Sequence, residues 1–183
     1  MIRAIITDFD GTLVDTFDAN LKAYQKAFEE VGVVLSEEKY RECFGFRFDR
    51  FMEAMGISEK ETIVRIKSLK KDYYPLFFES LHPNDALIEL IRSFKCFGGK
   101  TAIASTARKE NLMNALKYLG IVDLFDLIYT GQDVENGKPS PEIYDKTMAE
   151  LQVQPSDTLI FEDSEVGLQA AKASGAYFIK ITF

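Results

Sequence analysis

Apolar residues follow two different patterns along the chain, and the pattern changes near residue 82. Beyond that point, short apolar runs alternate with stretches of about ten residues in which apolar side chains recur at helical spacing. A further apolar run opens the chain and stops abruptly at two acids and a glycine. These patterns predict strands over 2–7, 101–105, 127–130, 158–161 and 177–181, and helices over 85–94, 111–119, 141–151 and 166–174.

Strands that alternate with helices of this length are typical of βαβ units. They predict an α/β fold with a mostly parallel sheet and helices on both faces. The nearly continuous apolar character of 2–7 fits a strand buried on both faces of such a sheet. We expect residues 1–14 and 82–183 to form this α/β core domain.

No strand pattern occurs between residues 16 and 80. Leu21, Tyr24, Phe28 and Val31 lie on one face of an expected helix over 16–31. Ser36 is a candidate N-cap for a second helix. More helix is expected over 49–55 and 59–78. Residues 15–81 are therefore expected to be a helical domain inserted after the first strand.

The composition narrows the possible partners. The 183 residues carry a formal net charge of −7, which disfavours non-specific binding to nucleic acid or to an anionic membrane. No apolar run approaches the roughly 20 residues that cross a bilayer, and the apolar start is too short for a signal peptide. Cys43 and Cys96 belong to no metal-binding pattern, and free thiols are favoured over one disulfide. The default expectation is a cytoplasmic protein.

Polar residues that could bind a ligand or take part in a reaction follow the predicted strands. Ligands bind at the carboxyl ends of strands in an open parallel sheet, so these residues should converge. Clustered carboxylates without His or Cys favour Mg²⁺ over zinc. A serine hydroxyl and a lysine could hold a phosphate. The candidates are Asp8 and Asp10 after the first strand, Ser105 and Thr106 after the second, Lys138 on the loop after the third, and Glu162 and Asp163 after the fourth.

Each candidate also has an ordinary structural explanation. The acids at 8 and 10 could be a solvated turn, Ser105 and Thr106 a helix N-cap, and Lys138 a surface lysine. Glu162 and Asp163 could simply begin a helix, where acids are favoured by its dipole. Four such features at four predicted strand ends are much harder to attribute to chance.

Four motifs resemble those of the haloacid dehalogenase-like hydrolase superfamily: DFDGTLVDT (8–16), Ser105-Thr106, Lys138-Pro139 and FEDS (161–164). A helical insertion after the first strand resembles the subgroup that includes phosphoglycolate phosphatase and β-phosphoglucomutase. The resemblance implies a Rossmann-like core with an inserted α-helical cap. It also implies a Mg²⁺-dependent phosphatase for a small phosphorylated metabolite.

The resemblance also implies residue roles. Asp8 would be the nucleophile that forms an aspartyl-phosphate, and Asp10 the proton-transfer group. The metal would be held by Asp8, the Asp10 carbonyl and Asp163, with Glu162 beside them. Ser105, the Thr106 backbone and Lys138 would bind the phosphoryl group.

The insertion departs from the mutase pattern. Asn20 stands where those mutases place a histidine, and residues 43–50 miss their specificity loop by one register. Asn20, Arg47 and Arg50 remain candidates for substrate specificity, although a surface arginine is the simpler interpretation. His82, the only histidine, is expected to be a hinge or surface residue.

Three alternatives to a phosphatase stay open. They are a phosphosugar mutase of the same fold, a non-catalytic binder of a phosphorylated ligand, and a phosphate-sensing switch, which the long insertion disfavours. The chain also stops soon after its last predicted strand, where relatives usually continue through another helix. A monomer or weak dimer is expected.

Overall fold

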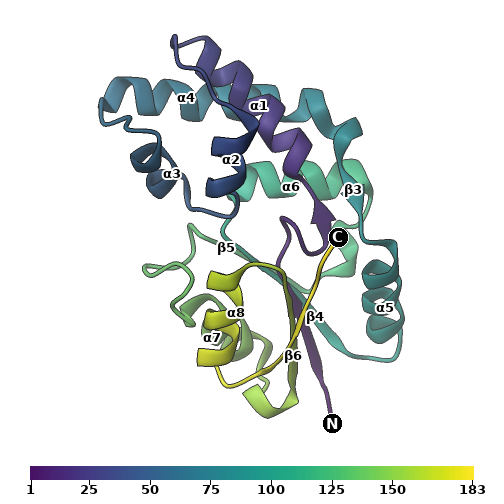
Figure 1. The fold of residues 1–183 in the computed structure, drawn as a ribbon. Coiled ribbons are helices and arrows are strands. Elements are labelled where there is room, and N and C mark those ends of the chain that lie inside the picture. Colours follow the sequence, from purple (N-terminus) through teal and green to yellow (C-terminus); the bar gives the residue numbers. More distant parts are fainter. The chain divides into compact units, whose positions relative to one another are not determined.

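The computed structural model describes residues 1–183, and the chain divides into two units. The first unit consists of Met1–Asp15 and His82–Phe183, and the second of Thr16–Leu81. Figure 1 shows both, coloured along the chain. No helix in either unit has the length and apolar character needed to cross a membrane.

A five-stranded parallel sheet forms the centre of the first unit. Its order is β5-β4-β1-β6-β7, so the first strand of the chain lies in the middle. All four pairings are parallel, which confirms the predicted fold class. The strands are β1 (Ala4–Thr7), β4 (Lys100–Ser105), β5 (Leu127–Thr130), β6 (Thr158–Glu162) and β7 (Tyr177–Lys180).

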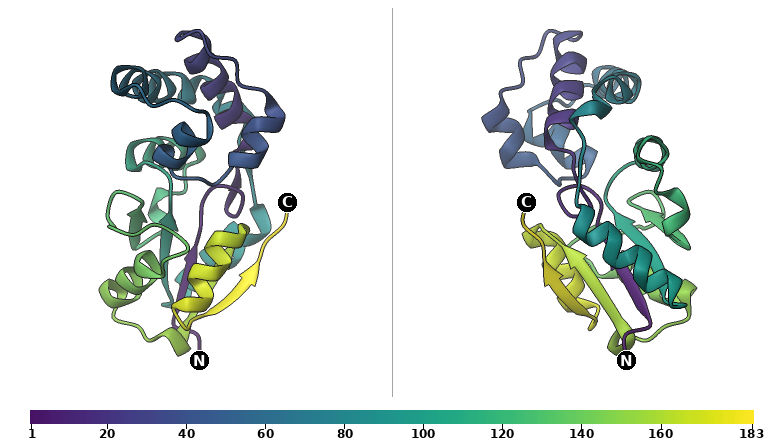
Figure 2. Two further views of the ribbon diagram at one scale, coloured as in Figure 1. Left: turned by 60° about the vertical axis from the view of Figure 1, so that its left-hand side comes forward. Right: turned by 90° about the vertical axis from the view of Figure 1, so that its right-hand side faces the viewer.

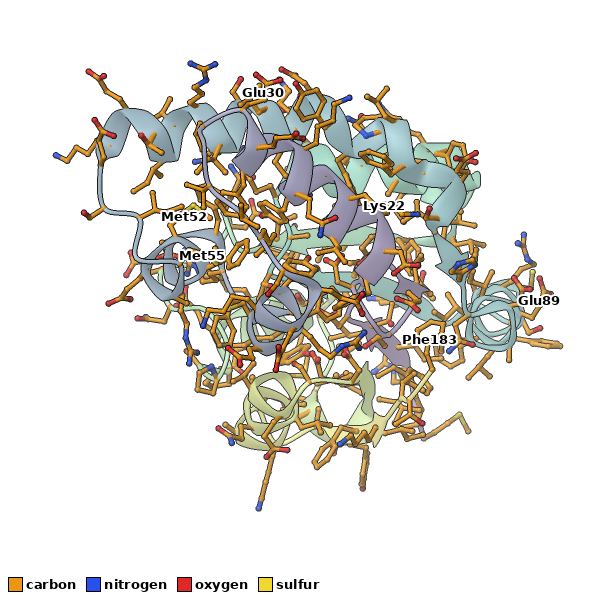
Figure 3. All side chains as sticks on the ribbon, turned by 45° about the horizontal axis from the view of Figure 1, so that its top comes forward. Lys22, Glu30, Met52, Met55, Glu89 and Phe183 are labelled. Atoms are coloured by element: carbon orange, nitrogen blue, oxygen red, sulfur yellow. The ribbon has the colours of Figure 1, made fainter.

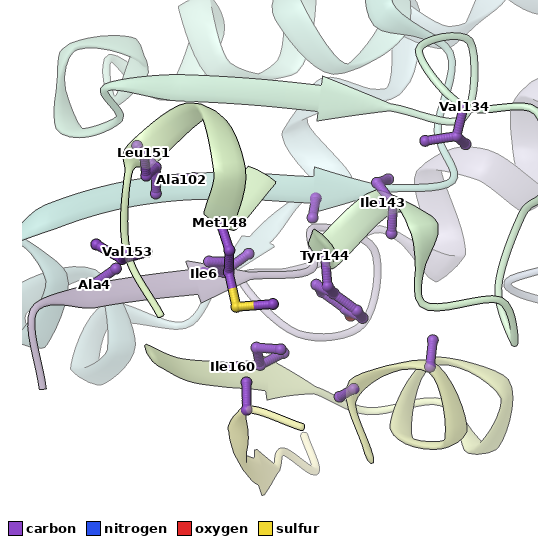
Figure 4. Close-up of a cluster of buried hydrophobic side chains, with 14 residues drawn as sticks. Ala4, Ile6, Ala102, Val134, Ile143, Tyr144, Met148, Leu151, Val153 and Ile160 are labelled. Atoms are coloured by element: carbon purple, nitrogen blue, oxygen red, sulfur yellow. The ribbon is translucent and has the colours of Figure 1, made fainter. Parts of the chain in front are cut away.

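Helices cover both faces of this sheet. They are α5 (Asp85–Cys96), α6 (Lys109–Leu119), α7 (Glu142–Leu151) and α8 (Glu165–Ala173), with short 3₁₀ turns at Val122–Leu124 and Pro155–Asp157. Side chains from α7 and α8 pack with Ile6, Ala102 and Ile160 in one buried cluster (Figure 4). The helix α5 packs against β4 but adds nothing to this cluster, and Figure 2 shows it on the opposite face.

A small ribbon closes the first unit where the second is inserted. The strands β2 (Val14–Asp15) and β3 (His82–Pro83) pair antiparallel. Asn84 follows the ribbon, donates its backbone N–H to the Leu13 carbonyl and caps α5 through its side chain. The ribbon was not predicted, because strands of two residues carry no periodic signal. His82 is exposed in it.

The second unit is entirely helical. It contains α1 (Phe17–Glu29), α2 (Glu37–Cys43), α3 (Phe48–Ala54), α4 (Lys60–Tyr73) and a kinked 3₁₀ segment, Tyr74–Ser80. Ser36 caps α2 by accepting a hydrogen bond from the Lys39 N–H, as predicted. The helix expected over 59–78 ends instead at Tyr73, because Pro75 cannot supply the next backbone donor.

Aromatic side chains hold the helical unit together. Tyr24, Phe28, Tyr40 and Phe51 meet with ring centroids 5.0–6.1 Å apart, mostly edge to face or tilted. Figure 3 labels Met52, which lies on α3 and is buried among them, and Met55, which follows the end of that helix. Both cysteines are free thiols; Cys43 lies in this core and Cys96 is exposed on α5.

Candidate active site

Asp8 directly follows the central strand β1 and therefore lies at the carboxyl edge of the sheet. The Asp8 N–H donates to the Phe161 carbonyl of β6 at 2.9 Å, so the backbone bridges the two strands where both end. Its side chain is buried. Asp10 lies two residues further on and is partly exposed, on a turn that the pairing of Asp10 with Val14 closes.

Lys138 joins two acids from different strands. Its Nζ lies 2.7 Å from Asp8 Oδ1 and 2.6 Å from Glu162 Oε2, and its side chain is only 2% exposed. It comes from the long loop between β5 and α7. The structure therefore excludes the surface-lysine interpretation of Lys138 and places its charge inside the acidic group.

Glu162 accepts hydrogen bonds on both carboxylate oxygens. Oε2 accepts from Lys138 Nζ and, at 2.7 Å, from the Tyr144 hydroxyl. Oε1 accepts from the Asp163 N–H and from both the N–H and the hydroxyl of Ser164. Gly167 in the first turn of α8 lies directly against this carboxylate, where a Cβ would overlap it. These contacts fix Glu162 tightly.

Asp163 completes the acidic group. Its Oδ1 accepts a hydrogen bond from the Thr12 hydroxyl at 2.7 Å. Gly11 has a φ of +87° and approaches so closely that a Cβ there would lie 2.5 Å from Asp163 Oδ2. The glycine thus meets a conformational and a steric need at once. Carboxylate oxygens of Asp8, Glu162 and Asp163 lie within 4.8 Å of one another.

The charges in this cluster do not balance. Burial opposes the charge on Lys138, but Asp8 and Glu162 outweigh it and hold the pKa of Lys138 well above its ordinary value. Burial also opposes the charge on Glu162, and Lys138 reverses this, so the pKa of Glu162 is lowered. One cation cannot satisfy both acids, and burial raises the pKa of Asp8 well above normal, with Glu162 and Asp163 adding to it.

Asp163 shows the same excess of negative charge. Its burial, with a smaller effect of Glu162, raises its pKa to about 6 against the opposing Thr12 hydrogen bond. Ordinary aspartates titrate near 4. A group of buried acids with raised pKa values stabilises a bound cation, because the cation removes the repulsion between them. The oxygen donors fit a hard divalent metal ion.

Ser105 is the last residue of β4, which pairs with β1 on the side away from β6, and Thr106 follows it. Ser105 is fully buried, and its Oγ accepts a hydrogen bond from the Ala107 N–H at 3.1 Å. Thr106 is half-buried, and its carbonyl lies close to Gly131. These two residues share the carboxyl edge of the sheet with the acids, but no hydrogen bond joins Ser105 to them.

The three specificity candidates belong to the helical unit and are placed only within it. Asn20 is buried on α1 and donates from Nδ2 to the Thr16 hydroxyl at 3.0 Å. Arg47 lies 3.8 Å from Asp49, and the Arg50 guanidinium lies 4.0 Å from the centre of the Phe46 ring. Both arginines therefore have local partners.

Sequence reasoning missed three side chains that support the cluster. Thr12 and Ser164 lie inside two of the family motifs, but the motifs did not indicate that these side chains hydrogen-bond to Asp163 and Glu162. Tyr144 carried no signal, because a tyrosine on the apolar side of a helix is indistinguishable in sequence from any other core residue.

Comparisons with known proteins agree with this architecture. Residues 5–181 match the haloacid dehalogenase-like hydrolase family. The match covers most of the α/β sheet and all of the acids at its carboxyl edge. The chain belongs to this family.

Individual relatives resemble the chain over most of its length. It is 31% identical over 179 residues to a phosphorylated carbohydrates phosphatase of Thermotoga maritima, covering 95% of this chain and 82% of that protein. It is 27% identical to a β-phosphoglucomutase of Bacillus subtilis, covering 98% of this chain and 83% of that protein. The crystal structure of CbbY from Rhodobacter sphaeroides in complex with phosphate superposes with a TM-score of 0.90 at 28% identity, covering 100% of this chain and 87% of that one.

Proposed function

We propose that this protein is a phosphatase that hydrolyses a phosphate ester of a small metabolite through a covalent intermediate on Asp8, with Mg²⁺ as its cofactor. The observation that carries the proposal is the pairing of Asp8 with Lys138 beside two further acids. Relatives named as phosphatases support the choice of reaction.

Asp8 is the nucleophile in this proposal. Lys138 holds one of its oxygens and orients the carboxylate. An Asp8 oxygen attacks phosphorus, forming one O–P bond as the bond to the leaving oxygen breaks. Asp10 gives its proton to that leaving oxygen. Asp10 then takes a proton from water, which attacks phosphorus and releases phosphate and Asp8.

The acidic group fits Mg²⁺ by the chemistry of its donors and by its excess of negative charge. Asp8, Asp163 and the Asp10 carbonyl would hold the ion. Glu162 would lie beside these ligands, since both its oxygens already accept hydrogen bonds. When bound, the ion neutralises charge on the phosphoryl oxygens.

Lys138, Ser105 and the Thr106 backbone would bind the phosphoryl group. The Lys138 ammonium is the one buried cation beside the acids, so it can attract a second anion once a metal ion has offset the surplus charge. Ser105 accepts from Ala107 and keeps its hydroxyl proton for a phosphoryl oxygen.

The helical unit would act as a cap that excludes water and selects the substrate. Asn20, Arg47 and Arg50 are its candidate specificity residues. A mutase is the second candidate, because a β-phosphoglucomutase is among the relatives. Asn20 in place of the mutase histidine favours the phosphatase. The product separates the two: free phosphate, or an isomeric sugar phosphate.

The test is Asp8→Asn. The variant should fold normally, as checked by circular dichroism, and should release phosphate several orders of magnitude more slowly from a panel of phosphorylated metabolites and p-nitrophenyl phosphate. EDTA should likewise stop the wild-type enzyme, and Mg²⁺ should restore it. Near wild-type turnover by the variant would refute the mechanism.

A further inference from the structure

Tyr144 is a buried polar side chain to which the proposed mechanism gives no role. It lies on α7, and it is among the largest fully buried residues of the chain. Its ring belongs to the apolar cluster between α7, α8 and the sheet (Figure 4), whereas its hydroxyl donates to Glu162 Oε2 at 2.7 Å. A phenylalanine would fill the same space, so the hydroxyl is the part that needs an explanation.

We infer that Tyr144 is a positioning residue, whose hydroxyl fixes Glu162 and, through it, holds the ammonium of Lys138 against Asp8. This inference rests on the proposed function of Asp8 and Lys138. It adds a residue that touches neither the substrate nor the metal ion.

The contacts form a continuous chain. Tyr144 and Lys138 share one oxygen of Glu162, at 2.7 and 2.6 Å, and Lys138 extends from it to Asp8 at 2.7 Å. The other oxygen of Glu162 accepts from the Asp163 N–H and from the N–H and hydroxyl of Ser164. A carboxylate offers about four lone-pair sites, and these donors occupy them. Tyr144 is thus one of the donors that hold the Glu162 carboxylate in this orientation.

The tyrosine ring gives Lys138 a second constraint. The Lys138 ammonium lies 5.1 Å from the ring centroid, within the range of a cation–π contact. Replacement by phenylalanine keeps this contact and the packing but removes the hydrogen bond. Tyr144→Phe therefore isolates the hydroxyl.

The same helix supplies a matched control. Thr147 is fully buried on α7, and its hydroxyl donates to the Ile143 carbonyl of its own helix. Thr147→Val also removes one buried hydroxyl at nearly constant shape. It has no connection to Glu162 and should leave kcat/KM for phosphate release within about twofold of wild type.

The kinetic arm uses p-nitrophenyl phosphate with Mg²⁺ present. Tyr144→Phe should lower kcat/KM roughly tenfold, as outer partners of functional side chains commonly do. The inhibition constant of inorganic phosphate should rise in parallel, because Lys138 is displaced from the anion site. A purely structural role would lower stability alone. A kcat/KM within twofold of wild type would overturn the inference.

A second arm does not depend on activity. Urea unfolding in EDTA is measured for Tyr144→Phe, Lys138→Met and the double variant. If the hydroxyl acts on Lys138 through Glu162, the unfolding constant of the double variant should differ roughly fivefold from the value expected for independent changes. Thr147→Val combined with Lys138→Met should be additive.

The two arms separate the possible failures. If wild type releases phosphate from no compound tested, the proposed function fails, and the unfolding cycle alone decides the role of Tyr144. Additive unfolding would then overturn the inference, and coupling would support it. If wild type is active and Tyr144→Phe is unchanged, only the inference fails.

Discussion

Replacing Lys138 by methionine tests whether the charge balance of the site is understood. Methionine keeps an unbranched apolar stem that is one atom shorter, and it removes the cation that pairs with Asp8 and Glu162. The side chains of these two acids are 7% and 1% exposed, so water cannot replace the lost partner. Removing one member of a buried pair costs about 3–5 kcal/mol. A domain of ordinary stability has only about 5–15 kcal/mol to lose.

The pH dependence follows from the same contacts. In the wild type, Lys138 lowers the pKa of Glu162, so the stabilising pair is present near neutral pH and is lost as acid protonates Glu162. In the variant, burial should raise the pKa of Glu162 above its unfolded value, and it should raise further the pKa of Asp8, which burial already raises in the wild type. Their protonation then favours the folded state at low pH. The stability difference between the two proteins should therefore be largest near pH 8 and should shrink toward pH 4.

The assay is urea unfolding in EDTA at pH values from 4 to 8. Lys146→Met is the control, because Lys146 pairs with Glu142 on the surface of α7 and should leave the unfolding free energy close to wild type. Mg²⁺ should recover part of the stability of Lys138→Met by supplying positive charge to the acids. Equal stability of Lys138→Met and wild type at pH 8, or a difference that widens in acid, would refute the electrostatic account.

Three further predictions concern the turn, the glycine beside it and a surface acid. Asp10→Asn should slow release of an alkyl phosphate by ~10²–10⁴-fold, and an unchanged kcat would mean that Asp10 transfers no proton. Gly11→Ala should weaken Mg²⁺ binding by calorimetry, since its Cβ would displace Asp163, whereas Gly32→Ala, also at positive φ but with open space, should cost stability alone. Burial opposes the charge on Asp126, but hydrogen bonds donated by Lys95 and Thr101 outweigh it and lower its pKa. Asp126→Asn should therefore be less stable than wild type in urea at pH 7, and the difference should vanish below about pH 4.

Most strands and helices of the α/β core could be predicted from the sequence, because a parallel sheet gives a strong hydrophobic pattern. Its central strand β1 is buried along its whole length and is apolar up to its last residue, Thr7, as expected of a strand with both faces covered. The rule that such strands end at one edge also predicted the meeting of Asp8, Lys138 and Asp163, residues far apart in sequence.

Other features depend on contacts that a linear pattern does not contain. The ribbon of β2 and β3 is too short to show a period. The hydrogen bond from Tyr144 to Glu162 depends on how α7 docks on the sheet, which leaves no trace in the local sequence. Nor could spacing reveal that Gly167 lies against Glu162, because the reason for that glycine is a neighbouring side chain and not its own backbone.

The ribbon of β2 and β3 in the first unit has a consequence for how such a protein can be rebuilt. Asp15 and His82 are direct partners across β2 and β3, so the chain departs and returns at neighbouring points. Opposed residues of an antiparallel pair lie about 5 Å apart, a gap that a two-residue hairpin turn closes. The 66 residues of Thr16–Leu81 are thus an insertion whose two ends leave the core at neighbouring points. A shorter or foreign segment could be spliced in at the same joint without altering the order of the strands that carry Asp8 and Asp163.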